Sequence, residues 1–219
     1  MSIANYLTFI RIFISPIFLF VYLEYETFDL NLVTLPYVLL FLLGVSELSD
    51  ACDGYFARKY NEVTDLGKIL DPMADSIYRI SIFLTFTLPP VRLPMILIFI
   101  LLYRDSVVST LRTICALKGY ALAARPSGKL KAGIQAFSAF VIILLLIPYS
   151  LGKMPESTLQ LTSTIIAAVA SIYTLFSGFD YIYANRHYIS RLLTSKNDHP
   201  IPSVEIGRAS CRERVSSPV

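Results

Sequence analysis

The stretch DACDGYFARKYNEVTDLGKILDPMAD, from Asp50 to Asp75, separates two long apolar runs of the chain. It carries the aspartates Asp50, Asp53, Asp71 and Asp75. A charged side chain at bilayer depth costs several kcal/mol, so in a membrane protein it usually marks a functional site or a cavity lined by protein. If the flanking runs cross a membrane, we therefore expect these aspartates to form such a site.

The composition is typical of an integral membrane protein. Of the 219 residues, 55% are hydrophobic and only 16% are charged, and the mean hydropathy is +0.60. In a soluble domain about a quarter of the residues would be charged. The formal net charge is only +3 and no polybasic block is present, so no nucleic acid is expected as a partner.

Several apolar segments are long enough for transmembrane helices, which need about 20 residues each. No soluble domain fits between them, and the first is expected to be a retained span because no basic region precedes it. We therefore predict an all-α integral membrane fold with six transmembrane helices, forming a single domain over residues 1–196. The predicted spans are Tyr6–Tyr22, Leu32–Leu48, Asp71–Leu88, Leu93–Leu117, Gly128–Tyr149 and Thr158–Tyr183.

Residues 197–219 are predicted to be a disordered tail. Within this tail, the sequence EIGRASCRERV (Glu205–Val215) lacks apolar periodicity and can be encoded by a common sequencing adapter. We interpret residues 205–215 as a non-native artefact, and an ordinary disordered basic tail is the alternative. Under both interpretations the tail has no role in the site.

Loop charges predict how the spans are oriented. The connection after the first span, EYETFDLN, carries Glu24, Glu26 and Asp29 and no basic residue. Basic residues follow the second, fourth and sixth spans, and positive residues favour the cytoplasmic side. Both termini, the aspartates and the segment ARPSGKLK are therefore expected at the cytoplasmic face. The basic residues are Arg58, Lys59, Lys68, Lys118, Arg125, Lys129, Lys131, Arg186, Arg191 and Lys196.

The aspartates fall into two pairs with helical spacing. Asp50 and Asp53 are three positions apart, Asp71 and Asp75 are four apart, and on a helix each pair would share one face. Gly54 allows a break in the backbone. Pro72 suits the first turn of a helix, for which Asp71 would be the N-cap. We therefore predict that the first pair ends one helix and the second pair begins the next.

Four converging carboxylates would repel one another unless cations neutralise them. Two divalent ions would balance the charge, and oxygen ligands favour Mg²⁺ or Mn²⁺ over zinc. Paired ions are a recurring device for displacement at phosphorus, and a carboxylate at the rim could take a proton from an attacking hydroxyl. The alternative is that the aspartates are helix caps or solvated loop residues.

The spacing of these residues resembles the signature of the CDP-alcohol phosphatidyltransferase family. The signature is D-x-x-D-G-x-x-A-R, eight residues, then G-x-x-x-D-x-x-x-D, and this sequence fills every position. The resemblance implies a bundle of six transmembrane helices, often a homodimer, with a divalent-metal site at the cytoplasmic surface. It also implies a reaction in which a hydroxyl attacks the phosphate of a CDP-linked lipid or alcohol and CMP leaves.

The resemblance also implies roles for individual residues. Asp50, Asp53 and Asp71 would be metal ligands, and Asp75 would be both a ligand and the general base. The cytidine diphosphate pocket would be lined by Gly54, Ala57, Arg58 and Gly67.

Basic residues farther along the chain indicate the acceptor. Arg104 and Arg112 are eight positions apart, which places them on one face of the fourth span. Buried arginines in a membrane need an anionic partner, and a phosphate on the acceptor would supply one. The cationic set Arg104, Arg112, Arg125, Lys129 and Lys131 therefore favours glycerol 3-phosphate.

The same segments resemble bacterial members of the family that make phosphatidylglycerophosphate from CDP-diacylglycerol. This resemblance implies that Asn5, Thr8 and Arg11 lie beside the nucleotide. It also implies phospholipid biosynthesis at the bacterial inner (cytoplasmic) membrane, with a multi-pass chain, membrane lipid around it and a site that faces the cytoplasm.

Two positions differ from many of these proteins, and other functions stay open. Ser49 and Ser76 stand where Thr and Lys are common, and Arg79 could replace the lysine charge or pair with Asp75. The acceptor could instead be inositol phosphate or serine. A divalent-cation transporter is the alternative of another class, although aspartates near one membrane face do not fit a transport site at the midplane.

Overall fold

Apolar runs of 20 residues or more give the chain its long helices. The computed structural model describes residues 3–60, 65–117, 126–186 and 189, and among these the side chains of residues 10–49, 73–115, 126–186 and 189. Over this part of the chain the secondary structure is six α-helices and one short 3-10 helix, with no strand. The elements are α1 (Ile3–Leu23), η1 (Tyr25–Phe28), α2 (Leu35–Tyr60), α3 (Asp65–Thr85), α4 (Met95–Leu117), α5 (Pro126–Ser150) and α6 (Glu156–Ala184).

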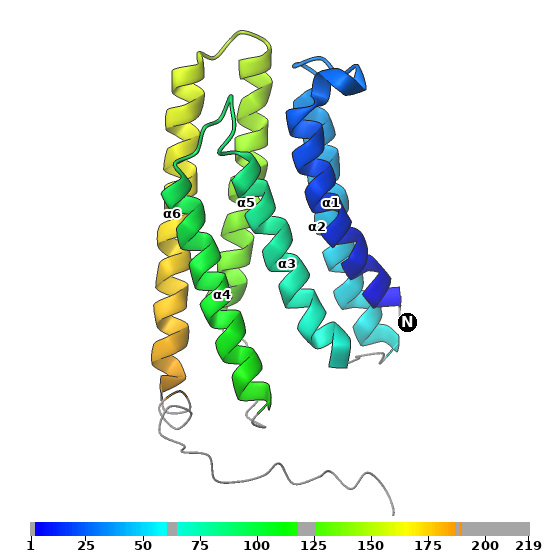
Figure 1. The fold of residues 1–219 in the computed structure, drawn as a ribbon, viewed down its shortest axis with the longest axis vertical. Coiled ribbons are helices and arrows are strands. Elements are labelled where there is room, and N and C mark those ends of the chain that lie inside the picture. Colours follow the sequence, from blue (N-terminus) through cyan, green and yellow to red (C-terminus); the bar gives the residue numbers. More distant parts are fainter. Residues whose placement is uncertain (1–2, 61–64, 118–125, 187–188, 190–219) are drawn as a thin grey trace, which may run out of the picture.

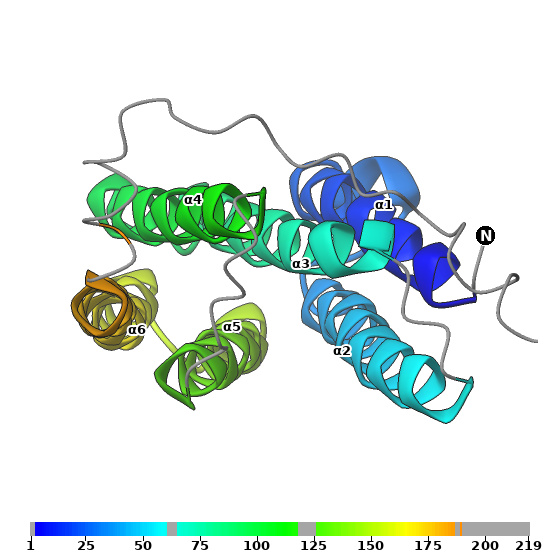
Figure 2. The same cartoon turned by 90° about the horizontal axis from the view of Figure 1, so that it is seen from below.

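The helices form two layers (Figures 1 and 2). One layer contains α1, α3 and α4, and the other contains α2, α5 and α6; α1 packs on α2, α3 on α5, and α4 on α6 between the layers. The connections after α1, α3 and α5 lie at one end of the bundle, and the N-terminus of α1 lies at the other. The alternating helix directions agree with the predicted order of spans.

An aromatic cluster forms the core near the end opposite the N-terminus. Phe18 and Phe86 are fully buried, and Phe86 packs edge-on against Phe18, Tyr22 and Phe83. Edge-to-face packing is favourable for aromatic pairs because the positive ring edge meets the negative ring face. This cluster ties α1 to the end of α3.

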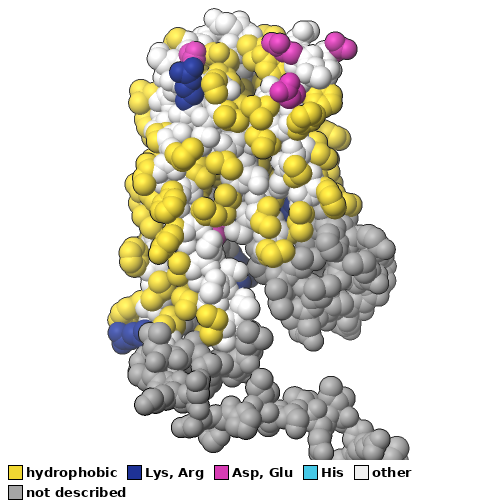
Figure 3. Space-filling model, in the orientation of Figure 1, with side chains coloured by type: hydrophobic (Ala, Val, Ile, Leu, Met, Phe, Trp, Pro, Cys, Tyr) yellow, Lys and Arg dark blue, Asp and Glu magenta, His cyan; other side chains and the backbone are white. Residues whose placement is uncertain are grey.

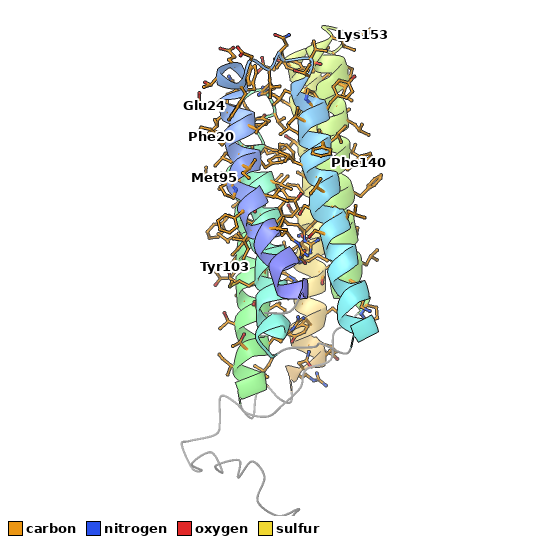
Figure 4. The ribbon with its side chains drawn as sticks, turned by 90° about the vertical axis from the view of Figure 1, so that its right-hand side faces the viewer. Phe20, Glu24, Met95, Tyr103, Phe140 and Lys153 are labelled. Carbon is orange, nitrogen blue, oxygen red and sulfur yellow. The ribbon has the colours of Figure 1, made fainter. Side chains whose placement is uncertain are left out.

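The outer surface of the bundle is largely apolar (Figure 3). Large hydrophobic side chains are exposed on every helix, among them Phe41, Phe137 and Phe179 with exposed fractions of 69%, 67% and 70%. In Figure 4, Phe20, Met95, Tyr103 and Phe140 point away from the bundle, while Glu24 and Lys153 lie at its end. Apolar patches larger than a few hundred Å² mark contact with a membrane or a partner.

Length and hydropathy single out two helices in the described part of the chain as able to cross a bilayer, α5 and α6. Two other helices contain shorter apolar segments, Ile10–Leu23 in α1 and Leu35–Ser49 in α2. The six predicted spans correspond in order to the six helices, and the passage of all six through a membrane stays a prediction.

The predicted helix boundaries around the aspartates were wrong. α2 continues through Gly54 to Tyr60, so the first pair does not end a helix. A glycine in a helix interior costs only about 1 kcal/mol relative to alanine, which is too little to end a long helix. Asp50 and Asp53 therefore lie inside α2.

The second pair does not begin a helix either, because α3 starts at Asp65 and includes Pro72. Asp71 is therefore not an N-cap. The residues Leu66, Ile69, Leu70 and Met73 repeat at helical spacing on both sides of the proline. This apolar stripe favours a helix across Pro72, although proline removes one backbone hydrogen bond.

Candidate active site

A charged cavity lies between α3, α4, α5 and α6, in the half of the bundle that contains the N-terminus. Its volume is about 260 Å³. In Figure 3, acidic and basic side chains lie recessed below the apolar surface in this half. The charged residues that line the cavity are the cations Arg79, Arg104, Arg112, Lys129 and Lys131 and the anions Asp75 and Asp105. The excess of cations makes the cavity suitable for an anionic group.

Asp75 lies at the α3 wall of the cavity and is held by arginines from two helices. It forms an ion pair with Arg79, one turn farther along α3. Its Oδ1 also lies 3.8 Å from Nη1 of Arg11, which is 1% exposed on α1. The two arginines orient this carboxylate. Of the two roles predicted for Arg79, the structure shows the pairing with Asp75.

Asp105 is the centre of a second ionic cluster. Its carboxylate accepts hydrogen bonds from Nζ of Lys131 at 2.7 and 3.0 Å and from Nη1 of Arg104 at 3.0 Å. The hydroxyl of Ser76 donates to Oδ2 at 3.2 Å. Asp105 is 6% exposed, and a buried carboxylate needs such partners because desolvation penalises its charge. The cluster joins α3, α4 and α5 at the cavity wall.

Two arginines of α4 reach the cavity beside α6. Nη2 of Arg104 donates to Oγ of Ser177 at 2.8 Å. The guanidinium of Arg112 lies over the ring of Tyr181, 5.9 Å from its centroid, a distance typical of a cation–π contact. The Nε atoms of both arginines are buried, and among the described residues neither has a hydrogen-bond partner. Each guanidinium has five N–H donors, so beyond these contacts the Nη atoms of both arginines keep donor capacity for an anion.

The first turn of α5 closes one side of the cavity. Ser127, Gly128 and Lys129 line it, and the Ser127 hydroxyl donates to Oδ2 of Asp180 on α6 at 2.6 Å. The N–H groups at a helix N-terminus are unpaired within the helix and favour an anion nearby. This turn adds to the positive character of the cavity.

The structure brings together the predicted site residues whose side chains it describes. Asp75, Arg104, Arg112, Lys129 and Lys131 all line the one cavity. Lys131 is 8% exposed and donates to both oxygens of Asp105. The other predicted residues lie outside the described side chains: Asn5, Thr8, Asp50, Asp53, Gly54, Ala57, Arg58, Gly67, Asp71 and Arg125.

Several residues that line the cavity, or that bind its lining residues, were missed by the sequence analysis. Asp105 adjoins Arg104, and an acidic residue inside an apolar span is itself a signal of function. The same signal was present at Asp180 in the sixth span. Ser177 and Tyr181 gave no comparable signal, because serine and tyrosine are common in membrane helices.

The aspartates offer a donor set that suits a hard divalent cation. Asp50 and Asp53 are one turn apart on α2, and Asp71 and Asp75 are one turn apart on α3, so each pair shares a helix face. Carboxylate oxygens are preferred by Mg²⁺ and Mn²⁺. Among the described side chains no group of three or more potential metal ligands occurs. The donor chemistry fits such an ion.

A helical bundle with an apolar outer surface and a cationic cavity that contains Asp75 is suited to bind a phosphorylated lipid. The chain belongs to the CDP-alcohol phosphatidyltransferase family, whose sequence model matches residues 1–176. The match contains the full aspartate signature and most of the cavity.

Several similar proteins carry the same name. A CDP-diacylglycerol–glycerol-3-phosphate 3-phosphatidyltransferase of Bacillus subtilis is 30% identical over 193 residues, which cover 84% of this chain and 95% of the relative. Proteins of the same name from Rickettsia felis and Rickettsia typhi are 29% and 30% identical over 85% of this chain, and 97% and 98% of their own lengths. The resemblance inferred from the sequence is therefore confirmed at the level of the family.

Proposed function

We propose that the chain transfers a phosphatidyl group from CDP-diacylglycerol to sn-glycerol 3-phosphate, releasing phosphatidylglycerophosphate and CMP. The observation that carries this proposal is the cavity in which Asp75 faces an excess of cationic side chains. A phosphorylated acceptor supplies the net negative charge that these cations need, whereas serine, a zwitterion, or a neutral alcohol does not. The names of the relatives support the same acceptor.

We assign the acceptor phosphate to Arg104, Arg112 and Lys129. Both arginines line the cavity with N–H donors beyond those that the protein contacts use, and Lys129, which also lines it, is exposed. Arginine suits this task because its planar fork matches two phosphate oxygens. Lys131 has a different assignment, since Asp105 accepts its hydrogen bonds: it fixes Asp105, which in turn holds Arg104. The assignment of Arg125 to the acceptor phosphate stays a prediction, because Arg125 lies outside the described residues.

Asp75 is the proposed general base. The acceptor hydroxyl oxygen forms a bond to the phosphorus that carries diacylglycerol, and its proton moves to Asp75. The bond from that phosphorus to the oxygen of CMP breaks, and CMP leaves with the electron pair. Arg79 and Arg11 hold the Asp75 carboxylate in place for this transfer. General-base catalysis of this kind typically contributes about 10²–10⁴-fold to the rate.

Two divalent cations, Mg²⁺ or Mn²⁺, are part of the proposal. Asp50, Asp53, Asp71 and Asp75 would hold them, and when bound they supply positive charge that stabilises the diphosphate. The cytidine diphosphate would lie against Gly54, Ala57, Arg58 and Gly67, near Asn5 and Thr8.

We further propose that all six helices cross the membrane, with the cavity at the cytoplasmic face of a bacterial inner membrane. The apolar outer surface and the basic connections after α2, α4 and α6 support this orientation. A homodimer is expected from the family resemblance. Cysteine labelling from either side of sealed vesicles, at Thr27 and at Arg186, tests the orientation.

The test of the reaction is CMP release by purified protein in detergent with CDP-diacylglycerol and Mg²⁺ or Mn²⁺. Glycerol 3-phosphate, inositol phosphate and serine are supplied one at a time, with a control that lacks acceptor. We expect metal-dependent release with glycerol 3-phosphate alone. Release with inositol phosphate would support the role of the cationic cavity in binding a phosphate but would identify a different acceptor. Metal flux into vesicles without CMP release would instead favour a transporter.

A further inference from the structure

We propose that Ser177 and Gly178 on α6 are positioning residues that fix the guanidinium of Arg104 in the cavity for the acceptor phosphate. The inference rests on the proposed function, which assigns that phosphate to Arg104. Both positions lie beyond residues 1–176, where the family match ends, and neither belongs to the aspartate signature. Neither residue lines the cavity, so both act through Arg104 and not on the substrate itself.

Gly178 provides the space through which the Arg104 side chain reaches the cavity. A Cβ atom at position 178 would lie 2.9 Å from Cγ of Arg104, and 3.7 and 3.9 Å from its Nε and Cδ. Cγ is the second carbon of the side chain, so it moves only if the Cα–Cβ bond rotates or the two helices separate. Either change would carry the guanidinium away from its place.

Backbone conformation does not explain a glycine at this position. Gly178 lies inside α6, where the backbone is helical and an alanine would be favoured by about 1 kcal/mol. Its burial and its contact with Arg104 therefore indicate that the absence of a side chain is the property that matters.

Ser177 fixes the far end of the same side chain. Its Oγ accepts the hydrogen bond from Nη2 of Arg104 at 2.8 Å, and Asp105 accepts from Nη1 at 3.0 Å. Ser177 is 0% exposed, so water does not compete for this bond. With Nη1 and Nη2 each held by one protein acceptor, the plane of the guanidinium is set, and Nε stays buried without a partner among the described residues. The second hydrogens of Nη1 and Nη2 remain for an anion in the cavity, because the buried Nε is not accessible to one.

The experiment compares Gly178→Ala with Gly133→Ala. Both changes add one methyl group to a helical glycine, but a Cβ at position 133 meets nothing within 4 Å. A misplacement of about 1 Å in a positioning group can cost about 100-fold. We expect Gly178→Ala to raise the KM for glycerol 3-phosphate about tenfold or more and to leave the KM for CDP-diacylglycerol within about twofold. Gly133→Ala should change neither KM.

A double-mutant cycle with Arg104→Ala shows whether the effect passes through the arginine. The Arg104→Ala variant has no Cγ at this position, so in that background Gly178→Ala should add less than about twofold. An effect of Gly178→Ala that is as large in the Arg104→Ala background as in the unchanged protein would overturn the inference. So would an equal rise in the KM for both substrates.

Ser177→Ala keeps the test decisive if Gly178→Ala fails to fold, because it removes an atom and adds none. We expect the KM for glycerol 3-phosphate to rise about threefold to tenfold, the usual net worth of one intramolecular hydrogen bond. Ser163→Ala is the matched control, since Ser163 is also 0% exposed on α6 and its Oγ has no hydrogen-bond partner among the described residues. Equal effects at positions 163 and 177 would overturn the inference.

Failure of the proposed function gives a different result. If Arg104→Ala leaves the KM for glycerol 3-phosphate unchanged, Arg104 does not bind the acceptor phosphate. If Arg104→Ala raises that KM while Gly178→Ala and Ser177→Ala do not, only the positioning role is overturned.

Discussion

The two halves of the bundle are held together by different forces. Near one end, Phe18, Tyr22 and Phe86 pack as an apolar cluster that extends along α5 to Ile142. In the other half, Asp105 binds charged and polar partners from three helices. Packing in the apolar half depends only on the volume and shape of its side chains. The charged half is stable only if every buried polar group has its partner. The comparison predicts that changes in the charged half alter catalysis and that changes in the apolar half alter stability alone.

The largest effect is expected at Asp75, the proposed general base in the charged half. Asp75→Asn keeps the shape of the side chain and removes its ability to take a proton. Turnover should fall about 10²–10⁴-fold, as measured by CMP release at saturating substrates. Turnover near that of the unchanged protein would show that Asp75 is neither the base nor a required ligand.

Removing the centre of the ionic cluster should cost both stability and acceptor binding. Asp105→Asn leaves Arg104 and Lys131 buried without their carboxylate, and breaking a buried ion pair typically costs about 3–5 kcal/mol. We expect a clearly lower melting temperature in detergent and a raised KM for glycerol 3-phosphate. A raised KM with an unchanged melting temperature would mean that the cluster orients Arg104 without stabilising the fold.

A change in the apolar half provides the contrast. Ile142 is 0% exposed in the core, and Ile142→Val removes one methylene group. This should cost about 1 kcal/mol of stability and leave both KM values unchanged, because Ile142 belongs to the apolar core and does not line the cavity. A shift in the KM for glycerol 3-phosphate would show that the two halves are coupled.

The same contrast explains how much could be predicted from the sequence. Helix order followed from the apolar runs, and the spacing of Arg104 and Arg112 correctly placed both on one face. The end of α2 and the start of α3 could not be predicted from Gly54 and Pro72, because the continuous helical pattern outweighs the cost of one glycine, about 1 kcal/mol, and of one proline, about 3 kcal/mol. Cavity side chains outside the signature could be predicted from the sequence only where a charged residue interrupted an apolar span.

Contacts between distant segments account for what the sequence did not reveal. Arg104 and Ser177 are 73 residues apart, and Lys131 and Asp105 are 26 apart. No local pattern specifies which helices become neighbours, so Asp105 could not be identified as the partner of Lys131. The serine and glycine of α6 acquire a role only when α4 packs against them.

The smallest effect is expected for an exposed ion pair at the surface of the apolar half. Arg92 and Glu156 lie at the end of the bundle, with Nε of Arg92 3.9 Å from Oε1 of Glu156, and their side chains are 60% and 45% exposed. Exposed pairs contribute between 0 and about 1 kcal/mol because water and salt screen them. Glu156→Gln should therefore lower the melting temperature only slightly, less than Ile142→Val does, with turnover unchanged. Because Glu156→Gln and Asp105→Asn make the same chemical change, their difference measures what burial adds to an ion pair in this fold, and equal losses would contradict the contrast between the two halves.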